Sequence, residues 1–358
     1  MNDRVDDTAP ASGGIPMQSK YVTDEAAPPI TDLEGAYGVF WRLRERLQSA
    51  VRGRDDVIDL IIIAVLADGH VLLEDYPGSG KTTLAKALGD SIIDDIPDDN
   101  IVTIRRIQFT PDLLPSDVTG TTVFDPNTNK FFFRPGPIFA HIVLADEINR
   151  TSPKVQSALL EAMAEKQTTV DNRTRELDEL FLVIATQNPL DLAGTFPLPS
   201  AQLDRFLFKI KMTHIAPEAE YELLTNFREL KAMADRQDLA RVTRTEILDA
   251  RKVCREQVFV HSEVHRALVN IGQYTRNDER ILQGASTRSL VLSVAALQAR
   301  ALTQRRNYVT ADDVYGLCDK IFTHRLEFAP GVDQGEAVVH ECCQPELERF
   351  ARLSLAAG

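Results

Sequence analysis

The sequence predicts an α/β domain built on a parallel sheet, followed by an all-helical domain. Up to about residue 215, short apolar runs bounded by turn residues alternate with helical stretches, and from about Pro217 the pattern is helical only. Strands separated by helices are typical of parallel β-α units with both faces of the sheet covered. The length of 358 residues also leaves room for two folded domains.

The domain boundaries follow from composition and periodicity. Residues 1–30 are rich in Asp, Pro, Ala, Gly, Ser and Thr, so we expect a disordered N-terminal tail. The α/β core is expected over 31–215 and the helical domain over 216–358. Apolar residues spaced three or four apart from Leu33 predict a helix, and the apolar stretch 57–67 continues it.

The predicted strands are five apolar runs, at residues 71–73, 101–107, 141–145, 181–185 and 206–212. A helix is expected over 82–93, directly after the first strand and its turn. Two hairpins interrupt the core: "TTVFDPNTNKFFF", which turns at 126–129, and "TTVDNRTREL", which turns near Asp171 and Asn172. The three aromatics "FFF" at 131–133 are expected to pack within strands rather than to contact a ligand.

Charge and cysteine content disfavour several classes of protein. The net charge of −13 works against long contact with nucleic acid, which needs clustered Lys and Arg to release counterions. The four cysteines form no C-x-x-C pair, which fits a reducing compartment. The sequence shows neither a secretory signal nor an apolar stretch of the ~20 residues that a membrane span requires. We therefore expect a cytoplasmic protein without a membrane span.

The segment "EDYPGSGKTT", residues 74–83, predicts a phosphate-binding loop between a strand and a helix. Asp75 stands where the strict motif has glycine, but two later glycines remain to let backbone N–H groups point at phosphate oxygens. Lys81 would neutralise the β- and γ-phosphates, and the Thr82 hydroxyl would hold Mg²⁺. ATP and Mg²⁺ are thus the expected cofactors. The expected nucleotide-binding residues are Pro77, Gly78, Ser79, Gly80, Lys81, Thr82 and Thr83.

Two further strands end in polar residues. Asp146 and Glu147 close the run "HIVLA", and consecutive side chains of a strand point opposite ways. We therefore assign Asp146 to Mg²⁺ and Glu147 to the attacking water, as general base. Asn188 follows the run "FLVIATQ", where an amide can hydrogen-bond that water or the γ-phosphate.

Two arginines complete the candidate catalytic set. Arg205 in "QLDRFLF" precedes the last strand, and Arg288 in "GASTRSL" begins a helix of the second domain. Each follows a loop of small or proline residues and precedes an apolar run, which fixes a guanidinium where it can reach phosphate charge. The catalytic candidates are therefore Glu147, Asn188, Arg205 and Arg288.

Taken together, "EDYPGSGKTT", "LADEINRTSPKVQSALLEAM", "ATQNP", "FPLPSAQLDRFL" and "GASTRSL" resemble the MoxR family of AAA+ ATPases. The resemblance covers nearly the whole chain after the tail. It implies a five-stranded ATPase core with hairpin insertions, a helical lid, and a homo-oligomeric ring, expected to be hexameric, with ATP bound between subunits. It also implies chaperone-like remodelling of protein clients, often beside a partner with a von Willebrand factor A domain.

The same resemblance implies a role for each remaining candidate. Asn188 corresponds to the first sensor. Arg288 corresponds to the second sensor, reaching from the lid to the nucleotide of its own subunit, and Arg205 to the finger that reaches a neighbour's. Arg150 stays open as an alternative finger, and Thr287 stands where the family commonly has proline.

Other functions also stay open. The chain could be the ATPase subunit of a magnesium-chelatase-like complex, or a scaffold that is switched by nucleotide and barely hydrolyses it. A DNA translocase is disfavoured by the acidic charge and the lack of any basic run.

Two clusters show spacings that metal sites use. In "HSEVH", His261 and His265 flank a glutamate at the wrong position for a zinc-protease helix. His340 with Cys342 and Cys343 could bind a soft metal, and we expect this cluster to be structural or incidental.

Overall fold

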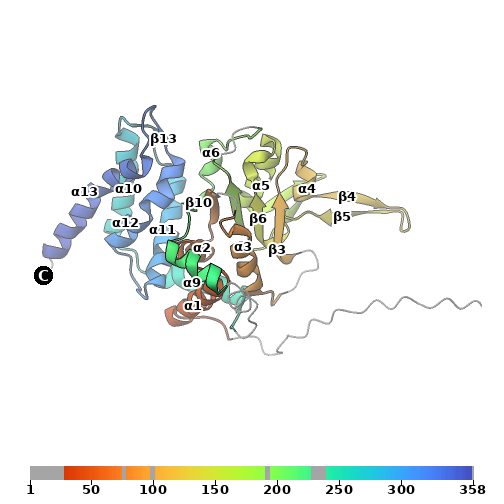
Figure 1. Cartoon of the computed structure of the whole chain (residues 1–358), viewed down its shortest axis with the longest axis horizontal. Helices are drawn as coiled ribbons and strands as arrows, with labels where there is room; N and C mark the ends of the chain where they lie inside the picture. Colours follow the sequence, from red (N-terminus) through yellow and green to blue (C-terminus); the bar gives the residue numbers. More distant parts are fainter. Residues whose placement is uncertain (1–27, 75–77, 97–100, 190–193, 227–238, 357–358) are drawn as a thin grey trace, which may run out of the picture.

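The computed structural model describes residues 28–74, 78–96, 101–189, 194–226 and 239–356. The predicted tail, 1–30, lies almost entirely outside these residues. Figure 1 shows a core that carries the sheet, with the helices of the C-terminal part gathered on one side of it. Among the described helices, none is both long and apolar enough to cross a membrane.

A five-stranded parallel sheet forms the core, as predicted, in the strand order β10-β1-β9-β6-β3. Successive side chains of a strand enter different hydrophobic clusters: Val71 and Leu73 face one cluster, and Leu72 the other. Because both faces are covered there, the central strands β1, β9 and β6 carry mostly apolar side chains before their last residues. The strands are β1 (His70–Glu74), β3 (Val102–Gln108), β6 (Ala140–Asp146), β9 (Leu182–Gln187) and β10 (Phe206–Lys211).

Helices α2 (Asp55–Leu66) and α3 (Lys81–Asp90) share a cluster with one face of the sheet, and α5 (Pro153–Glu165) shares one with the other. The prediction of one continuous helix through 33–67 is wrong. Helix α1 (Leu33–Ala50) ends four residues before α2, and Gly53 between them has φ +67°, a left-handed conformation that no α-helix continues through.

The helix predicted over 82–93 also ends early. Helix α3 stops at Asp90, and Ile92–Ile93 form a short strand, β2, which pairs in parallel with β11 (Val242–Thr243). Two residues of the C-terminal part thus supply the backbone hydrogen-bond partners of Ile92–Ile93, and the local sequence does not reveal this pairing.

Both predicted hairpins are present. Strand β4 (Gly120–Asp125), which follows α4 (Pro115–Thr119), pairs with β5 (Lys130–Pro135), and this hairpin projects from the body of the protein (Figure 1). The second hairpin pairs β7 (Gln167–Val170) with β8 (Arg173–Glu176).

The aromatics of the first hairpin behave differently along its length. Phe133 packs on Phe139 with ring centroids 5.6 Å apart, as expected for strand packing. Phe131 pairs with Phe124 at 5.1 Å, yet Phe131 is 73% exposed. The packing prediction therefore holds for the base of the hairpin, and the outer aromatics face outward.

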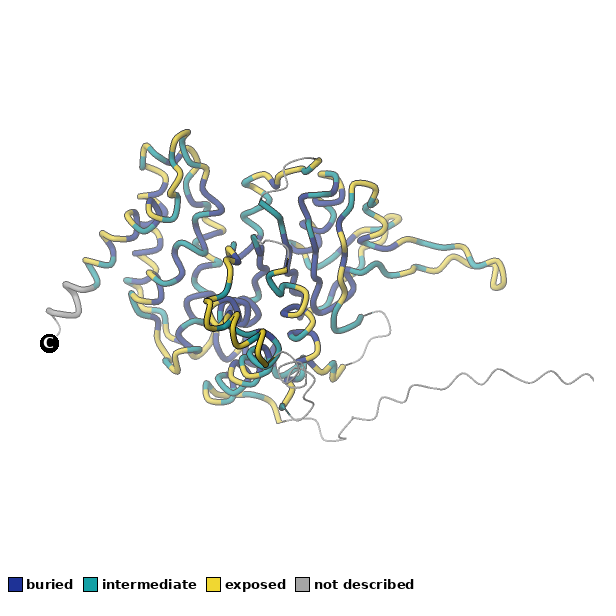
Figure 2. The backbone as a smooth tube through the Cα atoms, in the orientation of Figure 1, coloured by how far each residue is buried: buried dark blue, intermediate teal, exposed yellow. Residues whose placement is uncertain are grey.

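The C-terminal part is mostly helical, as predicted, and its helices pack against the N-terminal ones. Helices α1 and α2 contact α9 and α11, so a single hydrophobic cluster runs from one face of the sheet into the C-terminal helices. Figure 2 shows the buried residues concentrated there. The remaining elements are η1 (Ile148–Arg150), α6 (Ser200–Leu203), α7 (Pro217–Thr225), α9 (Arg244–Gln257), α10 (Ser262–Asn277), β12 (Ile281–Gln283), α11 (Thr287–Thr303), α12 (Ala311–Phe322), η2 (Thr323–Arg325), β13 (Glu327–Phe328) and α13 (Gly335–Ala356).

Candidate functional site

The phosphate loop follows β1 and leads directly into α3. Gly78 and Gly80 have φ +90° and +92°, where a side chain would be strained whatever the space around it. Lys81 begins α3, so the loop ends at a helix N-terminus, where unpaired backbone N–H groups favour an anion. Thr82 and Thr83 lie exposed in the first turn. Pro77 is outside the described residues.

A cavity of about 720 Å³ opens beside this loop. Its volume suits a ligand of nucleotide size. Apolar side chains line it from segments far apart in the sequence, which gives a surface for a planar base next to the glycines that would hold phosphates. These side chains include Val51, Met212, Ile215, Leu223 and Leu224.

Asp146 is the buried last residue of β6. Its Oδ1 accepts a hydrogen bond from the Thr186 hydroxyl at 2.7 Å and lies 3.6 Å from Nζ of Lys81. Its Oδ2 accepts from Nη2 of Arg106 at 2.6 Å. Burial alone would raise the pKa of Asp146, but the hydrogen bonds from Arg106 and Thr186 and the charge of Lys81 outweigh it and lower the pKa. The carboxylate is therefore ionised next to the lysine of the phosphate loop.

Glu147 leaves the strand in a left-handed conformation, with φ 58° and ψ 49°. For a residue other than glycine this is a strained backbone. Its N–H donates to the Thr186 hydroxyl at 2.9 Å, which helps to hold it. Its carboxylate accepts from Nε2 of Gln108 at 2.9 Å and lies 3.3 Å from Nε of Arg150. The carboxylates of Asp146 and Glu147 thus have different partners, as their assignment to different roles requires.

Asn188 directly follows β9. This strand lies between β1, which leads into the phosphate loop, and β6, which ends in Asp146. The strand order therefore places Asn188 at the same edge of the sheet as both.

Arg205 and Arg288 lie together at the opposite edge of the sheet, where β1 and β10 begin. They line a cavity of about 350 Å³ beside His70, the first residue of β1, whereas the phosphate loop follows the last residue of this strand. Arg205 donates to the carbonyl of Leu160 on α5. Arg288 therefore lies near the start of β1, and the phosphate loop of its own chain follows the end of that strand.

A hydrogen-bonded group holds the two arginines side by side. Ser286 caps α11 by accepting from the N–H of Ser289, and its hydroxyl also lies 3.1 Å from Oδ2 of Asp204, the neighbour of Arg205. Buried Arg325 pairs with the same carboxylate at 3.4 Å. The start of α11, with Arg288, is therefore fixed to the residues before β10.

Known proteins match this chain over most of its length. A family model described as "ATPase family associated with various cellular activities (AAA)" matches residues 70–208, and one described as "AAA lid domain" matches 273–342. Uncharacterized protein YeaC of Bacillus subtilis is 43% identical over 83% of this chain and 91% of its own length. Chaperone MoxR1 of Mycobacterium tuberculosis is 36% identical over 76% of this chain and 72% of its own length. The chain belongs to the MoxR family of AAA+ ATPases.

The solved structures support the same family. A predicted ATPase of Cytophaga hutchinsonii, known from its crystal structure, is 32% identical, with a TM-score of 0.75 over 88% of this chain and 96% of its own. As a member of this family, the MoxR-family ATPase described here hydrolyses ATP.

Three residues of this MoxR-family site were missed in the sequence. Thr186, Arg106 and Gln108 hold Asp146 and Glu147, and all three come from strands next to β6. A signal existed for two of them: Gln108 ends its strand in register with Asp146, and Thr186 is one residue beyond the Ala145–Ala185 pair. A polar residue at the end of a predicted strand that neighbours Asp146 is therefore a candidate partner of this carboxylate.

Proposed function

We propose that this ATPase works as a ring in which each nucleotide is hydrolysed between two subunits. The observation that carries the proposal is the position of Arg205 and Arg288. Both lie at the start of β1 and β10, while the phosphate loop of the same chain follows the end of β1. A head-to-tail contact would bring the arginines of one subunit to the phosphates of the next, and repeated contacts of this kind close into rings.

In the proposed site, the loop from Gly78 to Thr83 holds the phosphates of ATP. The donor set fits Mg²⁺ as well, because carboxylate and hydroxyl oxygens are the ligands it prefers. Asp146 and Thr82 would hold the ion, which supplies positive charge against the phosphates. The ionised state of Asp146 and its 3.6 Å approach to Lys81 support this assignment.

The remaining groups act on the water and on the developing charge. Glu147, supported by Gln108, accepts the proton of the attacking water. Asn188 hydrogen-bonds the water or the γ-phosphate, and the neighbour's Arg205 and Arg288 stabilise the charge that builds up on the phosphoryl oxygens. Arg150 is a less suitable finger, because it lies 3.3 Å from Glu147 of its own chain.

The work done by the ring is proposed to be the remodelling or maturation of protein complexes in the cytoplasm. The name of the relative Chaperone MoxR1 supports this function. A partner with a von Willebrand factor A domain is part of the same proposal. The four cysteines are free and buried, which fits a reducing compartment.

A Glu147→Gln variant tests the proposal. With ATP and Mg²⁺ it should bind nucleotide, assemble to several times the 39.9 kDa of the chain and release phosphate at least ~100-fold more slowly than wild type. Light scattering measures the assembly, and a phosphate-release assay measures hydrolysis. Lys81→Ala is the control that does not bind the nucleotide. If wild type stays a monomer with ATP, the ring proposal fails. Proteins that co-purify with the Glu147→Gln ring are the candidate clients.

A further inference from the structure

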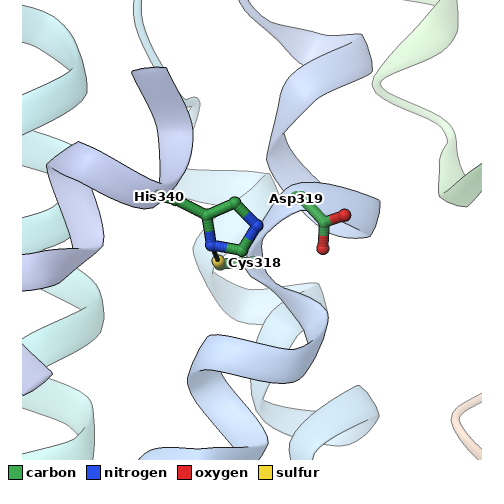
Figure 3. A group of neighbouring side chains, drawn as sticks. All are labelled: Cys318, Asp319 and His340. Atoms are coloured by element: carbon green, nitrogen blue, oxygen red, sulfur yellow. Dashed lines mark hydrogen bonds between the residues drawn. The ribbon is translucent and has the colours of Figure 1, made fainter. Parts of the chain in front are cut away.

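The last two helices, α12 and α13, bring together three side chains that commonly bind metals. Cys318 and Asp319 come from α12, and His340 comes from α13 (Figure 3). One donor atom from each of the three side chains lies within 4.8 Å of the donor atoms of the other two. The cluster lies apart from the residues assigned to ATP hydrolysis.

The spacing of the two softest donors matches a zinc site. Sγ of Cys318 lies 3.5 Å from Nδ1 of His340. Zinc binds sulfur at about 2.3 Å and imidazole nitrogen at about 2.0–2.1 Å in a tetrahedron, so two such ligands on one ion lie about 3.5 Å apart. The pair therefore needs little movement to bind a common ion.

The surroundings hold the donors in place. Cys318 is 1% exposed, and the His340 ring packs on Tyr315 with centroids 4.8 Å apart. Cys343, one turn along α13 from His340, contacts the Cys318 side chain.

Two contacts compete with metal binding. The Cys318 thiol donates to the carbonyl of Tyr315, with Sγ 3.2 Å from the oxygen. Nζ of Lys320 lies 2.7 Å from Oδ2 of Asp319. Lys320 is the next residue on the same helix, so a divalent ion can compete for the carboxylate without any change in helix packing.

We propose that Cys318, Asp319 and His340 bind one Zn²⁺ per chain and so join α12 to α13. Binding releases the thiol proton of Cys318. Zinc is the ion favoured by a mixed thiolate, imidazole and carboxylate set with tetrahedral spacing.

The test uses the full chain, stripped of metal by a chelator and kept reduced. Zn²⁺ titration should show one equivalent bound, with a rise in melting temperature, and Co²⁺ should give a thiolate-to-cobalt charge-transfer band. Cys318→Ser and His340→Gln should each weaken Zn²⁺ binding at least ~10-fold and abolish the rise. Cys342→Ser is the matched control, since this neighbouring thiol points to Asp278, with Sγ 3.8 Å from Oδ2, and should bind zinc like wild type.

Three results would overturn the proposal. Wild type that takes up no equivalent of Zn²⁺ would show only a thiol–imidazole hydrogen bond. Equal binding by wild type and the Cys318→Ser variant would place the ion elsewhere. A disulfide between Cys318 and Cys343 in freshly isolated protein, with no zinc bound after reduction, would make the thiols a redox pair instead.

Discussion

Ser286 donates a hydrogen bond to Asp204, with its Oγ 3.2 and 3.1 Å from the two carboxylate oxygens. This contact joins the helix that carries Arg288 to the strand that follows Arg205. The two arginines therefore form one unit on a single surface of the subunit, although 83 residues separate them in sequence. A surface that presents two guanidinium groups from such a joined backbone is suited to phosphate charge that another molecule supplies.

Loss of the Ser286 contact should weaken hydrolysis without weakening ATP binding. In Ser286→Ala, the cap of α11 and the link to Asp204 are both removed, which costs about 1 kcal/mol of stability. The turnover rate of the assembled protein should fall several-fold, because the arginines are less firmly placed. Steady-state hydrolysis and nucleotide titration check both quantities. Ser286→Thr, which keeps the hydroxyl, should restore the rate; an unchanged rate in Ser286→Ala would show that the link has no role.

An Arg288→Ala variant shows whether Arg288 acts on the nucleotide of its own subunit or on that of a neighbouring subunit. At a concentration where the chain is monomeric, Arg288→Ala should bind ATP as tightly as wild type, since the arginine lies beside His70 and away from the phosphate loop. In the assembled state its hydrolysis should fall ~100-fold or more, as for other arginines that act on a transferred phosphoryl group. Equilibrium binding to a fluorescent ATP analogue measures the first effect. Weaker binding by the dilute monomer would mean that Arg288 serves its own subunit after all.

Thr186 should prove necessary for the placement of both acids. Thr186→Val keeps the shape of the side chain but removes the hydrogen bonds to Asp146 and to the N–H of Glu147. A hydrogen bond to a charged group contributes about 1.5–3 kcal/mol, so hydrolysis should slow by about 10-fold or more. More Mg²⁺ should also be needed for half-maximal rate. Thr186→Ser should behave like wild type, and a Thr186→Val protein with normal Mg²⁺ dependence would remove Thr186 from the site.

His70 should make the fold sensitive to mild acid. Its Nδ1 accepts from the N–H of Val183 at 3.0 Å, so Nε2 carries the proton and donates to the carbonyl of Met163 at 3.1 Å. Burial lowers the pKa of His70 from 6.5 to about 4. The unfolded chain therefore binds a proton below pH 6.5 that the folded chain refuses until about pH 4, and stability falls as pH falls through this window.

Between pH 7 and pH 5 this histidine should cost about 2 kcal/mol of unfolding free energy. Urea denaturation at the two pH values measures the loss. His70→Gln should lose about 2 kcal/mol less over the same range, and equal losses in the two proteins would show that His70 does not titrate in this way. His324, also buried with a lowered pKa, contributes equally to both proteins and cancels.

The fold was largely predictable because four of the five strands of the main sheet, β1, β6, β9 and β10, are short, largely apolar and mostly buried. Each predicted strand is present, and the polar residues that follow β1, β6 and β9 share one sheet edge because parallel strands end together. The position of the predicted phosphate loop, Asp146 and Asn188 at one edge of the sheet could therefore be predicted from local sequence.

The rest depends on packing between distant segments. The cavity beside the loop is formed by residues 50–54 and 212–224, which carry no motif. The position of Arg288 depends on how the start of α11 lies on Asp204, and nothing within "GASTRSL" specifies that contact. Likewise, the pairing of β2 with β11 converts a predicted helix end into a strand.

Mixing two inactive variants shows whether each site is completed by a neighbouring subunit. The Arg205→Ala subunit keeps the general base Glu147 but lacks the arginine that acts on its neighbour's site. The Glu147→Gln subunit lacks the general base but keeps Arg205. In a randomly mixed ring about one interface in four joins an intact base to an intact arginine, so the mixture should recover up to about a quarter of the wild-type rate of hydrolysis. Replacing Glu147→Gln by the double variant Glu147→Gln/Arg205→Ala should abolish the recovery. A mixture of the two single variants that is no more active than either alone would show that Arg205 does not act on the site of a neighbouring subunit.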